Sequence, residues 1–273
     1  MVVYSISYIA GGGAEAARSF AYAQDDGVGL PRPNAFLHPT ASLCEAKRVG
    51  VRKQEGGLGL PEGRELLNTI RAKTMKRGGV GYVTPDTGSF PVMADTNQFV
   101  LAAGGIPTMT WLDGTSEGEQ AIEELIAVAR STGAAAINII PDRNYKPGVK
   151  DEKLDNLYKI VELAEKLDLP IVVGTEMNSP GQKFVDSFDT EELSPLVPVF
   201  LKGAHIVYAH SVLQQKCGFG YTSKWAEKNF QSTAGKNKFF ESLGSLLEPG
   251  DEEKIIGLSP DVTAGKILDM VKG

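Results

Sequence analysis

The sequence predicts an α/β protein whose mainly parallel sheet is curved into a β/α barrel, either distorted or incomplete. Four segments carry short apolar runs, most of them rich in β-branched residues, as is typical of strands buried on both faces. They start at Gly105, Ala134, Pro170 and His205, and each ends in polar side chains that can bind metals, move protons or hold oxyanions. Helical patterns separate the first three runs. Because the carboxyl ends of parallel strands share one face, where β/α enzymes have their sites, this pattern indicates an enzyme.

The best-defined part is a βαβαβ unit over residues 104–178, an arrangement that favours right-handed parallel crossovers. Its first helix should begin at a capping box made by Ser116 and Glu119 and should end at Gly133. The apolar face of that helix is Ile122, Leu125, Ile126 and Ala129. The unit then continues with a strand at Ala134–Pro141, a helix from about Lys153 to Leu167 with Leu154, Leu157, Val161 and Ala164 inward, and a strand at Pro170–Glu176.

Further elements are predicted on both sides of this unit, and residues 1–273 are expected to form a single domain because no linker or repeat divides them. Before the unit we expect a strand at Val2–Ile9, a helix from Ala14, a Gly- and Pro-rich connection over 25–63, a helix at Pro61–Lys76, a short strand at Val80–Val83 and a helix at Met93–Ala103. After it we expect a helix around Glu191–Leu201, the strand at His205, a helical region at Thr222–Leu246 and a final helix opened by Ser259 and Pro260. The first strand has no lead-in, so natural residues are expected before Met1.

Composition and charge exclude several classes of protein. The formal net charge of -6 and the pI near 5.3 argue against a dedicated nucleic-acid surface. Cys44 and Cys217 lack metal-ligand spacing, which favours reduced cytosolic thiols, with one disulfide as the alternative. No apolar stretch approaches the roughly 18 residues that a membrane span needs, and the amino-terminal segment lacks the basic region of a signal peptide. We therefore expect a cytoplasmic protein that acts on a small molecule.

Only three histidines are present, and they form no paired metal-binding motif. His205 and His210 are five residues apart on one predicted strand, so they should lie on opposite faces. His210, at the end of that strand and followed by Ser211, is the candidate for the site. His205 and His38 are interpreted as structural.

The candidate acidic and polar residues follow the other three strands. Glu176 ends a buried run, where a charge needs a metal, a role as base, or a partner such as Arg143. Asp142, Arg143 and Asn144 together suggest a site for a metal or an anionic group, with turn formation and helix capping as the alternative. Asp113 is followed by Gly114, so a turn competes with a site role there. Trp111 is a candidate substrate platform or a packing residue.

The arrangement over 104–180 resembles the later part of the polymerase and histidinol phosphatase (PHP) superfamily. In that family a double-glycine turn leads to a strand ending in Ala-His-Pro, and a later strand ends in Gly-Ser-Asp-x-His. Here Trp111 falls at the family's histidine, Glu176 at its aspartate and Asn178 at its second histidine, and the opening H-x-H is absent. The strings WLDGTSEGEQAIEEL, NIIPDRN and GTEMN are also similar to those of bacterial proteins described as PHP-like metal-dependent hydrolases.

This resemblance implies a distorted β/α barrel with a divalent metal at the carboxyl ends of its strands. Such a metal would activate a bound water and polarise a phosphoryl or carbonyl oxygen. The ligands would come from Glu176, His210, Asp142, Asn178 and Asp113, which are oxygens with one imidazole. Such a set suits manganese, iron or magnesium better than a closed structural zinc site.

Three functions therefore stay open from the sequence. The first is a metal-dependent hydrolase of the phosphoesterase type, with catalytic residues Glu176, His210 and Asp142 and with substrate contacts from Arg143, Asn144, Trp111 and Ser211. The second is a metal-independent lyase or isomerase of a sugar or sugar acid, with Glu176 as general base and Arg143 holding an anionic group. The third is a degenerate relative that binds a small ligand without catalysis. Fold alone cannot choose among them.

Overall fold

A computed structural model describes residues 5–8, 19–21, 62–76, 78–84, 90–146, 148, 151–175 and 184–272. Contacts divide the chain into two compact units, residues 1–23 with 90–273, and residues 24–89. The described part of the second unit is the helix α2 (Gly63–Thr74) with the turns that follow it. The single-domain organisation over 1–273 stays a prediction.

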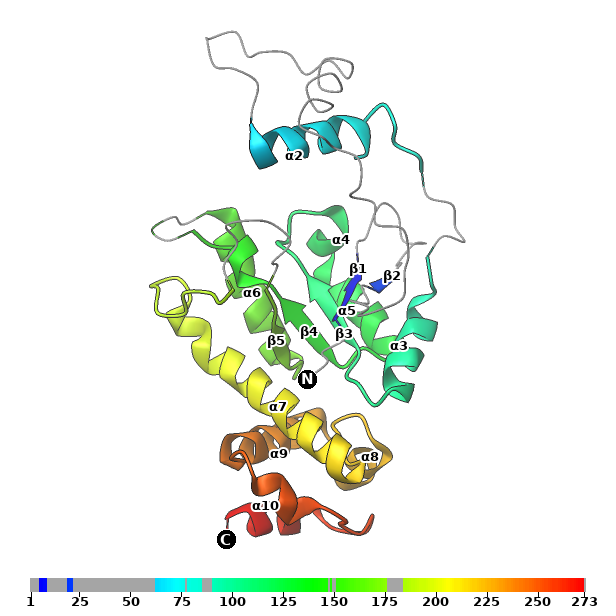
Figure 1. Cartoon of the computed structure of the whole chain (residues 1–273), viewed down its shortest axis with the longest axis vertical. Helices are drawn as coiled ribbons and strands as arrows, with labels where there is room; N and C mark the ends of the chain where they lie inside the picture. The colour runs from blue at the N-terminus through cyan, green and yellow to red at the C-terminus, as the bar shows by residue number, and fades with distance from the viewer. Residues whose placement is uncertain are drawn as a thin grey trace. The chain divides into compact units, whose positions relative to one another are not determined.

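The first unit is built on a five-stranded sheet in the order β2-β1-β3-β4-β5. Its strands are β1 (Ser5–Tyr8), β2 (Ser19–Ala21), β3 (Thr108–Trp111), β4 (Ala136–Ile139) and β5 (Ile171–Val173). β1, β3, β4 and β5 run parallel, and β2 pairs antiparallel with β1 (Figure 1). The predicted α/β class and mainly parallel sheet are confirmed. A complete barrel is not formed by the described residues, where β5 pairs with β4 alone and the sheet stays open.

The predicted βαβαβ unit is present, and its first helical stretch begins and ends at the residues that the sequence indicated. Ser116 caps α4 (Glu117–Gln120) by accepting from the Glu119 N–H at 3.3 Å, and α5 (Ile122–Ser131) follows directly. Gly133 stops α5 with a φ of +109°, a conformation that favours glycine. The side chain of Asp151 caps α6 (Glu152–Lys166). Both crossover connections are therefore as expected, each linking parallel neighbours.

The two faces of the parallel sheet differ in polarity. Met109, Trp111, Ile137, Ile139 and Ile171 join the apolar sides of α5 and α6 in one hydrophobic core. Alternation along the strands places Thr108, Thr110 and Asn138 on the other face, and all three are buried. Thr110 and Asn138 are direct partners in the β3–β4 register. Parallel sheets are usually apolar on both faces, so this buried polar face is unusual.

The predicted strand at His205 is wrong, because these residues belong to the 21-residue helix α7 (Val197–Cys217). The buried positions of α7 include Phe200, Gly203, Ile206, Ala209, His210 and Leu213, and their spacing of three to four residues is helical. The local run of β-branched residues predicted a strand. The segment is a helix instead, because its buried side packs on β5 and α9. Gly218 ends the helix with a φ of +73°.

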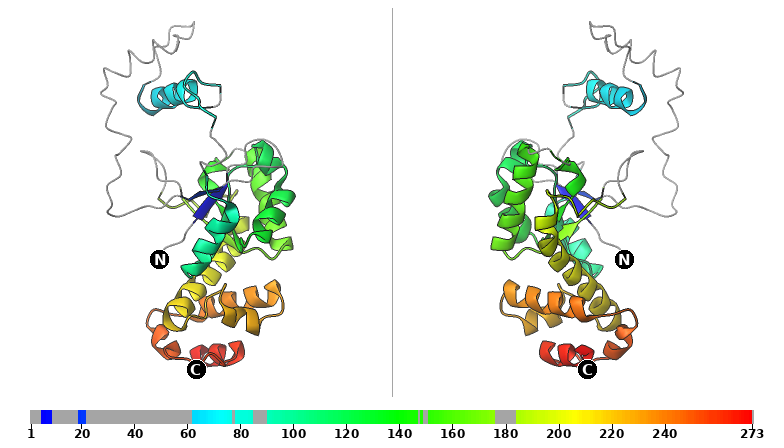
Figure 2. Two further views of the ribbon diagram at one scale, coloured as in Figure 1. Left: turned by 90° about the vertical axis from the view of Figure 1, so that its right-hand side faces the viewer. Right: turned by 90° about the vertical axis from the view of Figure 1, so that its left-hand side faces the viewer.

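Three helices follow α7 and form a second core with it below the sheet (Figures 1 and 2). They are α8 (Lys224–Asn229), α9 (Thr233–Leu246) and α10 (Ala264–Lys272). The predicted helical region Thr222–Leu246 is thereby confirmed as two helices. The final helix begins later than predicted, at Ala264 rather than after Ser259. The Ser259 hydroxyl instead accepts from the Asp261 N–H within a turn.

The amino-terminal predictions have mixed outcomes. α2, α3 (Met93–Ala102) and β1 lie where helices and a strand were expected. Ser19–Ala21 is a strand rather than part of a helix, and residues 80–83 form turn and irregular structure rather than a strand. The predictions for 25–61 lie outside the described residues, as do those for His38 and Cys44.

One helical stretch in the described part of the chain, Ser194–Cys217, is long and apolar enough to cross a membrane by length and composition. This differs from the prediction that no apolar stretch approaches the length of a membrane span. In this structure the stretch packs against β5 and α9. The buried core helix of a soluble protein can have the same length and composition, so these two properties alone are weak support for a membrane span.

Candidate active site at the carboxyl edge of the sheet

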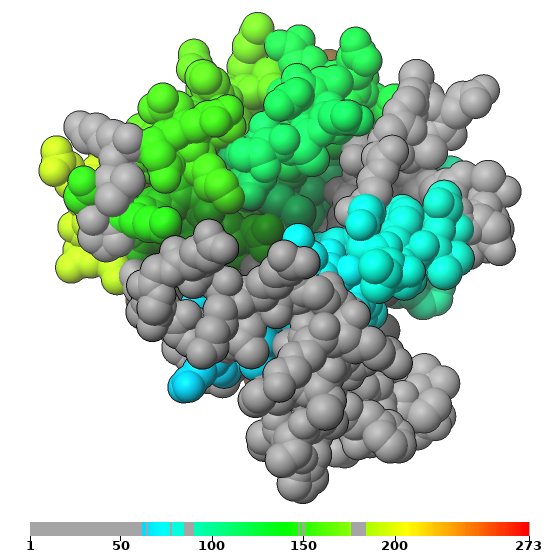
Figure 3. All heavy atoms as spheres, turned by 90° about the horizontal axis from the view of Figure 1, so that it is seen from above, coloured from blue at the N-terminus to red at the C-terminus, as the bar shows by residue number. Residues whose placement is uncertain are grey.

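The carboxyl edge of the sheet gathers four of the predicted site residues. Asp113 follows β3, and Asp142 and Arg143 lie in a 3-10 turn (η1, Pro141–Arg143) after β4, with Asn144 next. Glu176 and Asn178, predicted to follow β5, lie outside the described residues. In Figure 3, which looks at the molecule from above, the green residues of this region lie beside the yellow-green residues that precede α7.

Asp113 is committed to a local network. Its carboxylate accepts hydrogen bonds from the Thr115 hydroxyl at 2.6 Å and from Lys153 Nζ at 2.8 Å. Burial alone would raise the pKa of Asp113, but the hydrogen bonds from Lys153 and Thr115 outweigh it and hold the pKa below its usual range. Asp113 therefore stays ionised and links the loop after β3 to the first turn of α6. This is the turn role that the Asp-Gly pair indicated.

Glu119 shapes the same loop, a role that sequence reasoning missed. Its buried carboxylate accepts from the Leu112 N–H and, at 3.2 Å, from the Gly114 N–H. Gly114 has a φ of +72°, and a Cβ there would lie 2.9 Å from Asn156 Nδ2. The capping box was a signal for Glu119, but only the fold shows that the residue also fixes the loop after β3.

Asn144 joins the ends of two strands. Its Nδ2 donates to the carbonyl of Leu112 at 2.8 Å and to that of Ile140 at 3.0 Å, and its side chain is almost completely buried. Two acceptors on one side fix the orientation of the amide, with the nitrogen toward them. Asn144 thus ties the chain after β3 to the chain after β4, and the substrate contact predicted for it stays a prediction.

Asp142 differs from these neighbours. It is half-buried at the carboxyl end of β4, and its carboxylate makes neither a hydrogen bond nor an ion pair within the described part of the chain. Arg143, also half-buried, is adjacent in the same turn. Asp142 is therefore available for a ligand, whereas the Asp113 and Glu119 carboxylates are occupied.

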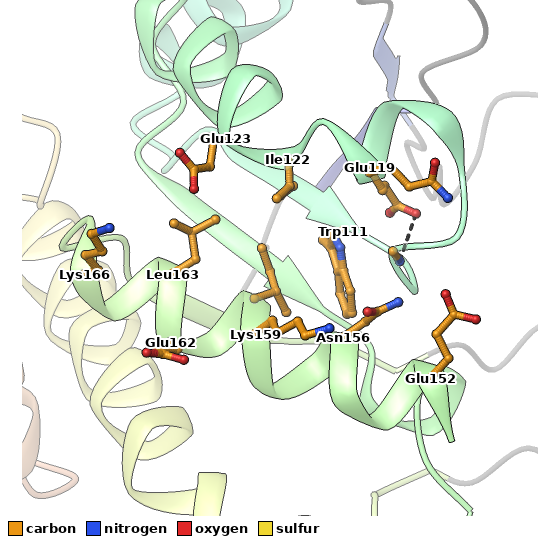
Figure 4. Close-up of a pocket in the computed structure, with 13 residues that line it drawn as sticks. Trp111, Glu119, Ile122, Glu123, Glu152, Asn156, Lys159, Glu162, Leu163 and Lys166 are labelled. Atoms are coloured by element: carbon orange, nitrogen blue, oxygen red, sulfur yellow. Dashed lines mark hydrogen bonds between the residues drawn. The ribbon is translucent and has the colours of Figure 1, made fainter. Parts of the chain in front are cut away.

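Trp111 points away from this edge and belongs to the core. It is 2% exposed and lies on the apolar face of the sheet, at the floor of a groove of about 470 Å³ between α5 and α6 (Figure 4). Glu123, Glu162 and Lys166 lie toward one end of this groove, and Glu152 lies at the other. The position of Trp111 fits the packing role, one of the two roles predicted for it, and its side chain does not face the strand ends.

His210 lies at the other end of the strands. Its Nδ1 accepts from the Tyr221 N–H at 2.9 Å, and the ring also hydrogen-bonds to the backbone of Gly104, which precedes β3. Burial lowers the pKa of His210 to about 4, against the opposing effect of the Gly104 hydrogen bond. The expected convergence of His210 with Asp142 is therefore wrong. Ser211 donates its hydroxyl to the Val207 carbonyl within α7.

The described residues do not by themselves make a metal site. No group of three or more His, Cys, Asp or Glu side chains close enough to hold an ion occurs among them. Of the predicted ligands that the structure describes, Asp142 alone combines a place at the carboxyl edge with a carboxylate that has no partner among the described residues. Comparison with protein-family models, with curated proteins and with solved structures found no match. The resemblance to the PHP superfamily stays a prediction.

Proposed function

We propose that this chain is an enzyme that hydrolyses a small anionic substrate, of the phosphoester type, at the carboxyl edge of β3, β4 and β5. The observation that carries the proposal is Asp142, a half-buried carboxylate without a structural partner in the described part, set between strand ends that are pinned by Asn144 and Glu119. A rigid frame around an uncommitted charge is the arrangement that a reactive or ligand-binding group needs.

The hydrolase would depend on a divalent metal held by oxygen donors. Asp142 would be one ligand, and Glu176, the residue after Thr175, would be another. A metal bound there would supply an activated water and charge stabilisation. The chain's own contribution is to orient Asp142, to hold Asp113 ionised through Lys153, and to bring Arg143 beside the substrate's anionic group.

A second candidate is a metal-independent lyase or isomerase of a sugar or sugar acid. One observation favours it. His210, the only imidazole in the predicted ligand set, lies at the amino ends of the strands and therefore does not reach a metal at the carboxyl edge. In this reading Glu176 is the general base, Arg143 holds the anionic group, and Asp142 is a second acid–base group.

The test measures hydrolysis of bis-p-nitrophenyl phosphate and p-nitrophenyl phosphate by the full chain, with manganese, magnesium or zinc and with EDTA. We expect metal-dependent turnover that falls at least about 100-fold in Asp142→Asn, because loss of a ligand or acid–base group has effects of this size. The matched control is Asp269→Asn, exposed on α10. Turnover of sugar acids that EDTA leaves unchanged would replace the first proposal with the second. Wild-type turnover retained in Asp142→Asn would refute both.

A further inference from the structure

The outer side of α6 carries a regular row of charged residues. All of them are exposed, and their charges alternate in sign along the helix. They are Asp155, Lys159, Glu162 and Lys166, here called the α6 stripe. The steps between them are four, three and four residues, and such steps keep side chains on one face of a helix. The α6 stripe is therefore a single charged face rather than a scatter of surface residues.

The α6 stripe differs from other charges of the same helix. Lys153 Nζ lies 2.8 Å from the Asp113 carboxylate, and the Glu165 carboxylate lies 3.0 Å from Lys202 Nζ on α7. These two residues of α6 face other elements of the fold, and both are paired. No side chain of the α6 stripe forms an ion pair or a hydrogen bond with the part of the chain that the structure describes.

Pairing within the helix is the simplest alternative use of this pattern. Asp155 with Lys159, and Glu162 with Lys166, have the i,i+4 spacing of such pairs. Neither pair forms a salt bridge in the structure. Exposed pairs of this kind are weak, so they can be exchanged for other partners at little cost. The α6 stripe is thus available to a partner outside the chain.

The α6 stripe borders an apolar groove. Its last three residues line the groove of about 470 Å³ between α5 and α6, which has Trp111 at its floor (Figure 4). Ile122 and Leu163 also line this groove and are only partly buried. Apolar side chains within a charged rim are the composition of a protein–protein contact surface.

The pattern of the α6 stripe is complementary to itself. Steps of four, three and four residues read the same from either end, whereas the signs of the charges are exchanged. In a pair of antiparallel helices, the equal rise per residue preserves this match along the whole contact. When Lys159 of one copy is level with Glu162 of a second copy, Asp155 is level with Lys166, and both pairs recur by symmetry.

We propose that this face is the interface of a homodimer, in which α6 of one copy packs antiparallel on α6 of a second copy about a twofold axis. Such an interface uses the same surface on both copies. It covers Ile122 and Leu163 of each chain, and the α6 stripe sets the register. One layer of helices is a small contact, so we expect a Kd on the order of 10 µM. This dimer is independent of the proposed function.

Sedimentation equilibrium of the full chain tests the proposal, because a dimer has twice the chain mass of 29.2 kDa. Lys159→Glu or Glu162→Lys places like charges together at two symmetry-related positions, so each should weaken association by about tenfold or more. Combining the two changes restores opposite signs and should return the Kd to within about threefold of the wild type. Lys224→Glu, exposed on α8, is the control matched for net charge and should leave the Kd unchanged.

A chain that stays monomeric at about 100 µM would overturn the proposal. A dimer that neither single variant weakens would also overturn it, because the contact would then lie on another face. A combined variant as weak as the single ones would overturn the antiparallel register. Circular dichroism of each variant separates lost association from lost folding, and the wild-type helical signal is expected in all of them because the changed side chains are exposed.

Discussion

At the scale of single residues, His210 joins three parts of the fold. Its ring receives the Tyr221 N–H and also bonds to Gly104. A Cβ at Gly220 would lie 2.7 Å from His210 Nδ1, so glycine is needed for this approach. Thr222 adds a hydrogen bond to the Gly105 carbonyl at 3.0 Å. The double glycine before β3 is therefore a docking point for the α7–α8 connection.

This environment predicts how stability depends on pH. The folded-state pKa of His210, about 4, lies below the unfolded value of about 6.5, so the unfolded chain binds more protons between these values. Stability should fall as pH drops through this window, by on the order of 3 kcal/mol from this group. Urea unfolding at several pH values should show a flatter profile in His210→Asn than in the wild type. An equally steep profile in His210→Asn would assign the effect to other groups.

At the scale of elements, α7 makes an unusually close contact with the sheet. A Cβ at Gly203 would lie 1.7 Å from the Ile171 carbonyl oxygen, which is backbone and cannot move aside. This explains a glycine inside a long helix, where it would otherwise be unfavourable. The contact sets the path of α7 over β5.

Gly203→Ala should therefore destabilise the protein by roughly 3 kcal/mol or more, because the helix must shift away from β5. The matched control is Gly265→Ala in α10, where an added Cβ meets nothing within 4 Å. That change should be neutral or stabilising by up to about 1 kcal/mol. Thermal or urea unfolding measures both. Equal effects in the two variants would show that the close contact is absent.

Local signals and packing explain which elements the sequence could predict. Signals that lie within a single helix gave predictions that are confirmed. They are the capping box at Ser116, the helix end at Gly133 and the apolar periods of α5 and α6. The strand predicted at His205 is wrong because the local β-branched run does not reveal the packing partners of this segment. The segment forms a helix that packs on β5 and α9. Of the candidate site, Asp113, Asp142 and Asn144 share the predicted edge. Lys153, which donates to Asp113, and Leu112, which accepts from Asn144, are distant in sequence, so only the fold supplies these partners.

At the scale of the whole first unit, α7 belongs to two cores. Phe200 packs with the sheet residues, and Ile206, Ala209 and Leu213 pack with α8 to α10. Trp111 lies in the first core and Trp225 in the second, and they are the only two tryptophans of the chain. Each core thus carries its own fluorescent reporter.

Because one rigid helix serves both cores, we expect them to unfold together. Trp225→Phe leaves Trp111 as the reporter of the sheet, and Trp111→Phe leaves Trp225 as the reporter of the helices. Within each variant, the urea midpoint from fluorescence should match that from circular dichroism. A helical signal lost well before or after the fluorescence of Trp111 would show two independent folding units.

The dependence of α7 on later helices has a consequence during synthesis of the chain. The helix α9, which covers one face of α7, is available only when residues up to Leu246 have left the ribosome, 29 residues after Cys217. At roughly 5–20 residues per second this takes about 1.5–6 s. For that time an apolar helix, hydrophobic enough to resemble a membrane span, lacks its partner. Nascent chains halted between these points are expected to recruit chaperones.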